Sequence, residues 1–185
     1  METFFLKQPP VKKKGAGSSR LTFVAIDFET ADYEPDSACA LGLVKVKGNA
    51  IAERAYYLIR PPRREFIFTD LHGITWEDVA GKPNFKKLWS QIRSFVDDAD
   101  FLAAHNASFD AEVLYACCKR ARLKCPRHRF VCTVELSDRA WGIYPRKLPH
   151  VCRHLGIRLK HHDALSDAEA CARIVIAAIR EGITP

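Results

Sequence analysis

The sequence lacks the long apolar runs of a membrane protein, because no stretch approaches the ~18 residues that a membrane span needs. Charges follow the short apolar start and no apolar core comes after them, which argues against a signal peptide. No two cysteines are spaced C-x-x-C, and their number, seven, is odd. These absences argue against a secreted disulfide framework, so we expect a protein of the reducing cytoplasm with no membrane contact.

One cysteine cluster carries an alternative interpretation. Cys125, His128 and Cys132 lie within eight residues, a spacing that permits zinc binding only if a distant residue supplies a fourth ligand. The competing interpretation is two buried apolar thiols beside a surface histidine, and this is the one that the sequence favours.

Length and charge predict one domain preceded by a basic arm. The chain has 185 residues, of which 48% are hydrophobic and 28% charged, as in an ordinary globular protein. The formal charge is +7, and residues 1–20 hold five of the cations against one acid. We expect a flexible basic arm at 1–20 and a folded domain at 21–185. The arm is either a phosphate-binding segment or a solvated tail, and the charge permits a polyanionic partner without identifying it.

Hydrophobic periodicity predicts an α/β fold. The predicted strands are 21–29, 42–47, 51–59, 101–104 and 130–133, and residues 61–74 form a loop before a helical turn opened by Thr75. Predicted helices cover 85–96, 108–122, 134–140, 148–155 and 164–180. Three strands in succession, followed by alternating helices and strands, predict a mixed five-stranded sheet flanked by helices.

Acidic residues occur at three places where such a sheet gathers ligands. Asp27 and Glu29 lie two apart in an apolar strand and therefore share a face. Asp110 lies in the first turn of a helix that follows a strand, where capping alone would explain it. His162 and Asp167 converge only if a helix begins between them, at Asp163. Together these groups form an oxygen-rich set that suits Mg²⁺ or Mn²⁺.

Four motifs resemble those of the DEDDh, or DnaQ-like, 3′–5′ exonuclease family. They are Asp27-Phe28-Glu29-Thr30, then the segment Leu71-His72-Gly73-Ile74-Thr75, His105 to Asp110, and His162 to Asp167. The resemblance covers about residues 21–180, and family members include the proofreading subunit of bacterial DNA polymerase III, RNase T and oligoribonuclease. One departure is that Ala31 and Asp32 follow Thr30 where relatives often have T-T-G or T-G, which puts the nucleotide-contacting turn in doubt.

The resemblance implies an RNase H-like fold and a site for two Mg²⁺ or Mn²⁺ ions, held by four acids, with His162 as general base. It implies cleavage of terminal phosphodiester bonds at single-stranded 3′ ends, DNA favoured, with release of nucleoside 5′-monophosphates. RNA as substrate, and a DNA polymerase as partner, are the alternatives. By the same resemblance, Thr30, His72 and Phe109 are expected to contact the substrate. His105 and His161 are expected to orient loops. The metal-holding acids are Asp27, Glu29, Asp110 and Asp167.

Two of these residues have structural interpretations as well. For Phe109, base stacking and core packing are equally open. For His72, stabilisation of its loop is the favoured role. A catalytically silent nucleic-acid-binding module on the same fold is a further alternative, against which the intact set of acids argues.

Overall fold

The computed structural model describes residues 21–185, so the predicted basic arm at 1–20 lies outside the described residues. The elements run in chain order as β1 (Thr22–Thr30), β2 (Ala38–Lys47), β3 (Ala50–Leu58), α1 (Thr69–His72), α2 (Trp76–Val79), α3 (Phe85–Val96), β4 (Phe101–Ala104), α4 (Ala107–Ala121), β5 (Phe130–Cys132), α5 (Thr133–Trp141), α6 (Leu148–Leu155) and α7 (Ala164–Arg180).

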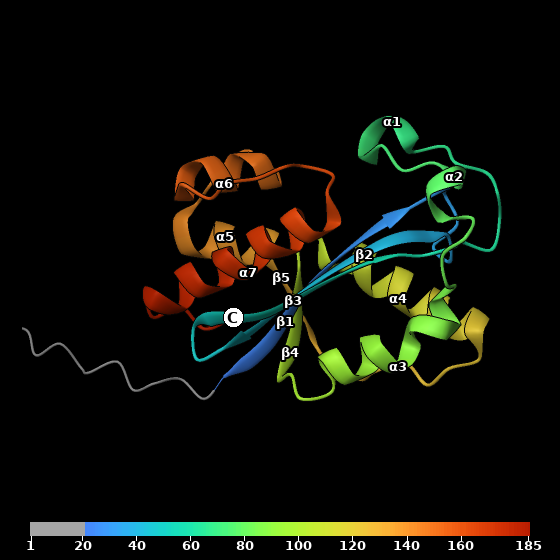
Figure 1. The fold of residues 1–185 in the computed structure, drawn as a ribbon. Helices are drawn as coiled ribbons and strands as arrows, with labels where there is room; N and C mark the ends of the chain where they lie inside the picture. The colour runs from blue at the N-terminus through green and yellow to red at the C-terminus, as the bar shows by residue number, and fades with distance from the viewer. Residues whose placement is uncertain (1–20) are drawn as a thin grey trace, which may run out of the picture.

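The five strands form one mixed sheet in the order β3-β2-β1-β4-β5. The pairs β1–β2 and β2–β3 are antiparallel, whereas β4 lies parallel to both β1 and β5. The first strand is therefore central, and its carboxyl end lies at the edge where open α/β sheets bind ligands. Figure 1 shows helices on both faces of this sheet. The predicted mixed five-stranded sheet is confirmed.

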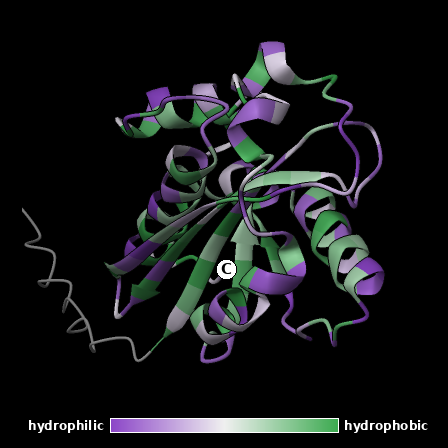
Figure 2. Ribbon diagram, turned by 45° about the vertical axis from the view of Figure 1, so that its right-hand side comes forward, coloured by the Kyte–Doolittle hydropathy of each residue, from purple (hydrophilic) through white to green (hydrophobic). Residues whose placement is uncertain are grey.

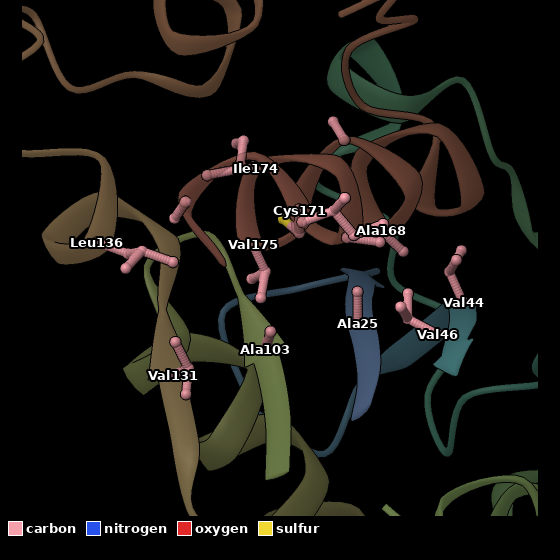
Figure 3. Close-up of a cluster of buried hydrophobic side chains, with 14 of the residues drawn as sticks. Ala25, Val44, Val46, Ala103, Val131, Leu136, Ala168, Cys171, Ile174 and Val175 are labelled. Carbon is pink, nitrogen blue, oxygen red and sulfur yellow. The ribbon is translucent and has the colours of Figure 1, made fainter. Parts of the chain in front are cut away.

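The two faces of the sheet bury separate apolar clusters. Phe23 and Ala25 of β1 face the cluster that includes α7, together with residues of α5 and α6. Val24 and Ile26, which alternate with them, face the cluster under α3 and α4. Figure 3 shows small and β-branched side chains of α7 lying over the sheet, and Figure 2 shows apolar residues running along the strands. Because side chains alternate along β1, each later residue of this strand faces either the α7 side or the α3–α4 side of the sheet.

Two predicted boundaries are wrong. The second strand begins at Ala38, four residues before the predicted start at 42, because Gly42 lies inside a ladder that continues past it. A short helix, α1, lies within the predicted loop at 61–74 and ends at Gly73, whose φ of 76° is left-handed. The other predicted elements agree to within one residue at each end.

None of the helices found in residues 21–185 is long and apolar enough to cross a membrane. The cytoplasmic location stays a prediction.

Candidate active site

The end of β1 presents two carboxylates toward α7. Asp27 and Glu29 keep the alternation of Phe23 and Ala25, so they lie on the α7 face, as their spacing predicted. Both are partly buried. The strand therefore carries its two acids at the carboxyl end, between the sheet and the start of α7.

Gly42 allows α7 to approach these acids closely. It pairs with Asp27 across the β1–β2 ladder. A Cβ atom at this position would lie 2.1 Å from the backbone oxygen of Ala164, the first residue of α7. Only glycine permits this contact. Sequence reasoning missed Gly42, since nothing in the strand pattern marks the helix that crosses it.

The start of α7 supplies the third carboxylate. Asp163 caps the helix by accepting a hydrogen bond from the Ser166 N–H, so the convergence required of His162 and Asp167 occurs. Oδ2 of buried Asp167 lies 2.9 Å from His161 Nδ1 and accepts the His162 backbone N–H at 3.1 Å. His162 has a left-handed φ of 63°, which turns the chain into the helix.

The fourth carboxylate comes from α4, on the opposite face. Asp110 is buried in the first turn of this helix and its Oδ1 accepts the Phe28 N–H at 3.0 Å. That bond ties α4 to the end of β1. Asn106 precedes the helix with a left-handed φ of 67°, a conformation that asparagine tolerates better than most residues.

Burial disfavours the ionised form of all four acids, and the pKa of each is raised. Burial, followed by the charges of Asp110, Asp167 and Glu29, raises the pKa of Asp27 well above its ordinary value. Burial also raises the pKa of Glu29 to about 7 and that of Asp110 to about 8. The pKa of Asp167 is raised by burial, against opposing hydrogen bonds from His161 and His162. The protein's own cationic groups near these acids are too few to keep all four carboxylates ionised.

These residues fit a divalent cation. One oxygen of Asp167, Oδ1, is buried without a hydrogen-bond partner in the described part of the chain. Ligand atoms of His161, His162 and Asp167 lie within 4.8 Å of one another. A cation would satisfy the orphaned oxygen and lower the pKa of the crowded acids. By contrast, Cys125, His128 and Cys132 are not among the groups of residues 21–185 that gather metal-ligand atoms.

An open cleft of about 570 Å³ lies over the acids. Phe109 lines it and is 42% exposed, so the core-packing interpretation of this ring is wrong. Leu71, which precedes His72 in the second of the four motif segments, lines the cleft as well. Phe68 and Lys147 also line it, and sequence reasoning missed these two because they come from segments with no motif. The predicted residues that line the cleft are Asp27, Glu29, Thr30, His72, Phe109, His162 and Asp167.

The four histidines of the cleft differ in the hydrogen-bond partners of their ring nitrogens. Nδ1 of His72 accepts the Ile74 N–H, so Nε2 carries the proton and donates to the Thr30 carbonyl at 3.1 Å. His105 is held between Thr133 Oγ1 and the Arg146 carbonyl. His161 is bound to Asp167 through Nδ1.

His162 differs, because no hydrogen bond among residues 21–185 engages its ring nitrogens. Its ring stacks on that of His161 with centroids 3.9 Å apart. Burial, and then the neighbouring His161, lower the pKa of His162. The imidazole is thus neutral and free to accept a proton at neutral pH.

The departure after Thr30 has a structural explanation. The buried carboxylate of Asp32 forms a two-pronged ion pair with Arg63, from Nε at 2.8 Å and Nη2 at 3.1 Å. Arg63 also binds Asp36. These bonds join the loop after β1 to the loop that leads toward α1, and so fix the cleft wall that carries Thr30.

Comparisons with known proteins agree with this geometry. The RNase T family model, described as Exonuclease, matches residues 24–175. The PolC-type DNA polymerase III of Thermotoga maritima is 29% identical over 159 residues, which are 84% of this chain and 12% of that protein. That of Oceanobacillus iheyensis is 34% identical over 154 residues, 80% of this chain and 11% of the relative. The chain thus spans about an eighth of these relatives.

Solved structures show the same fold. Exonuclease X in complex with 5′ overhanging duplex DNA has a TM-score of 0.72 and 24% identity, covering 88% of this chain and 94% of that one. The nuclease domain of 3′hExo, a DEDDh family member bound to rAMP, has a TM-score of 0.75 and 20% identity, covering 89% and 94%. The fold is therefore RNase H-like, as predicted. With a family model matched across 24–175 and the motif acids gathered at one end of the sheet, the chain belongs to the RNase T exonuclease family.

Proposed function

We propose that this protein is a metal-dependent 3′–5′ exonuclease acting on single-stranded nucleic acid, with DNA favoured, and releasing nucleoside 5′-monophosphates. One observation carries the proposal. Asp27, Glu29 and Asp167 line an open cleft that also holds an exposed aromatic ring and a histidine with free ring nitrogens, and buried Asp110 reaches the same end of β1 from the opposite face of the sheet. This is the chemistry that hydrolysis of a phosphodiester needs.

Exonucleases of this family depend on divalent metal ions, and we assign two Mg²⁺ or Mn²⁺ ions to this site. Asp27, Glu29 and Asp167 would hold one, and Asp110 the other, with Asp27 shared between them. Bound cations supply charge stabilisation at the attacking and leaving oxygens and make a bound water more acidic. The orphaned Oδ1 of Asp167 and the raised pKa values of the acids support this assignment.

The chain's own groups position the substrate and move the proton. A free ring nitrogen of His162 accepts the proton of the attacking water, and the lowered pKa of this imidazole keeps the nitrogen unprotonated and available at neutral pH. The exposed ring of Phe109 stacks on the terminal base, and Thr30 lies beside it in the cleft wall. His72 stabilises this wall of the cleft through its hydrogen bond to the Thr30 carbonyl, and His161 orients the Asp167 carboxylate.

DNA is the favoured substrate because the relatives named above are DNA polymerases, of which this chain matches one part. A DNA polymerase is accordingly the candidate protein partner. The rAMP bound by 3′hExo supports RNA as the alternative.

The test is a time course on end-labelled single-stranded DNA, duplex DNA and short RNA with Mg²⁺ or Mn²⁺. We expect stepwise shortening from the 3′ end of single-stranded DNA, release of nucleoside 5′-monophosphates, and full inhibition by EDTA. Hydrolysis that persists in EDTA, or in both Asp27→Ala and His162→Ala, would refute the proposal.

A further inference from the structure

A second and larger pocket, of about 710 Å³, lies away from the catalytic acids. It opens between the loop after β3, the start of α2, the start of α3 and the end of α4, elements that lie on one side of the molecule in Figure 1. We call it the basic pocket, because its lining contains five cationic side chains, Arg60, Arg64, Lys86, Arg120 and Arg122, and one acid, Asp36.

Most of this positive charge is unneutralised. Asp36 is already bound by Arg63 and by Arg120, the latter at 2.9 Å. The remaining four cations of the basic pocket have no ion-pair partner among residues 21–185, and their side chains are exposed. Exposed cations that converge on one concave surface attract polyanions. The acid-lined cleft has the opposite composition.

The pocket also offers a flat aromatic surface. The guanidinium of Arg64 lies 5.3 Å from the ring centroid of Trp76. Ile59, Pro61 and Phe85 complete an apolar lining beneath the cations. Phosphate groups suit the rim of such a pocket, and a base or sugar suits its apolar interior.

Two features connect the basic pocket with the cleft. The helix α4 places Phe109 in the cleft and Arg120 in the basic pocket, and eleven residues at 1.5 Å each separate them by about 16 Å. The loop after Thr30 reaches Asp36 in the pocket. Between them Tyr33, 77% exposed, packs edge-on against Phe68 of the cleft at 4.9 Å. An exposed aromatic side chain therefore lies beside the cleft, on the loop that leads to the basic pocket.

We propose that the basic pocket binds the phosphodiester backbone of the strand whose 3′ end occupies the cleft. This inference rests on the proposed exonuclease function. A stacked strand rises about 3.4 Å along its axis per nucleotide, so 16 Å corresponds to about five nucleotides from the end being cleaved. Substrates shorter than this reach the cleft without reaching the basic pocket.

The test compares substrate lengths. The pocket variant is Arg60→Gln/Arg64→Gln/Lys86→Gln, and the matched control is Arg153→Gln/Arg158→Gln/Arg180→Gln, three exposed cations that belong to α6, α7 and the loop between them. The substrates are the oligothymidylates dT3 and dT12. In the unmodified protein we expect kcat/KM to be about tenfold higher for dT12 than for dT3. The pocket variant should lose most of this ratio through KM, and the control should keep it.

A binding measurement supplies a readout that does not depend on cleavage. Fluorescence anisotropy of labelled dT12 is followed against salt in the presence of an added Asp27→Asn change. Removing three phosphate contacts should reduce the slope of log K against log[salt] by about two. The inference would be overturned if the ratio of kcat/KM for dT12 to that for dT3 were the same in the pocket variant and the unmodified protein. It would also be overturned if the control variant lost this ratio to the same extent as the pocket variant. Failure of the unmodified protein to cleave either substrate would instead refute the proposed function, and the salt slope would still test the pocket.

Discussion

The acidic cleft and the basic pocket carry opposite charge and hold it in different ways. At the end of β1, four carboxylates are crowded and partly or fully buried; burial raises the pKa of each, and repulsion from neighbouring carboxylates adds to this for Asp27, Glu29 and Asp110. In the basic pocket, four unpaired cations extend into water. Buried like charges are costly to hold together, whereas exposed ones are screened by solvent and salt. The buried acids therefore need a bound cation to become ionised together. The exposed cations of the pocket attract a polyanion with a strength that varies with salt.

If this contrast is correct, one neutralised acid in the cleft should have the largest effect of any single change. We expect Asp27→Asn to lower the rate on single-stranded DNA by at least about 10³-fold, because it removes a ligand shared by both proposed ions. The same variant should unfold at a higher temperature than the unmodified protein in EDTA at pH 8, since like-charge repulsion is relieved. An active variant would show that Asp27 is not essential.

The two stacked histidines sharpen the assignment within the cleft. General-base catalysis contributes about 10²–10⁴-fold, so His162→Ala should lose that much of kcat. His161→Ala should lose about tenfold, because it removes only the bond that orients Asp167. The pH–rate profile distinguishes the roles: the acidic limb should disappear in His162→Ala and persist in His161→Ala. The reverse pattern would make His161 the base.

Gly42 tests whether the cleft depends on a close helix–sheet contact. A Cβ at this position meets backbone of Ala164, so Gly42→Ala should displace the start of α7 together with Asp167. Overpacking costs about 1–3 kcal/mol, or a Tm lower by roughly 2–12 °C for a chain of this size, and we expect at least tenfold less activity.

Gly81→Ala is the matched control for this change, since no atom lies within 4 Å of a Cβ there. Differential scanning fluorimetry and the exonuclease assay measure both. Equal behaviour of the two variants would mean that α7 shifts without consequence for the site.

The sequence predicted the elements and the motif acids but not their contacts. Regular alternation in 21–29 and helical spacing in 164–180 are local signals, and these elements were predicted to within a residue. Gly42 looked like a strand boundary, because its role depends on Ala164, more than a hundred positions away. The ion pair of Asp32 with Arg63 and the basic pocket likewise arise only when separate loops meet.

The raised pKa values predict an unusual pH dependence of stability. Between its ordinary and raised pKa, each acid binds more protons in the folded protein than in the unfolded chain. The free energy of unfolding of the metal-free protein should therefore fall between about pH 4 and pH 8, a window set by Glu29 at about 7 and Asp110 at about 8.

Mg²⁺ or Mn²⁺ should reverse this loss, so thermal unfolding should show a larger metal-induced rise in Tm at pH 8 than at pH 6. The rise at pH 8 should be on the order of 5 °C and should be absent from Asp27→Asn/Asp167→Asn. A rise of equal size at both pH values would indicate a metal site elsewhere in the chain.

Phe109 should give the smallest effect, because stacking acts on the neutral base and not on the reacting charge. Base–aromatic stacking contributes roughly 1–3 kcal/mol, of which we expect the lower part here, a five- to tenfold higher KM for dT12 in Phe109→Ala with kcat little changed. Tyr115→Ala removes another exposed ring from α4 that lines neither the cleft nor the basic pocket, and it should leave KM unaltered. Steady-state kinetics on dT3 distinguishes changes in the cleft from changes in the basic pocket. The Phe109 effect should persist on this short substrate, since the terminal base is still present, whereas the effect of the basic pocket should vanish.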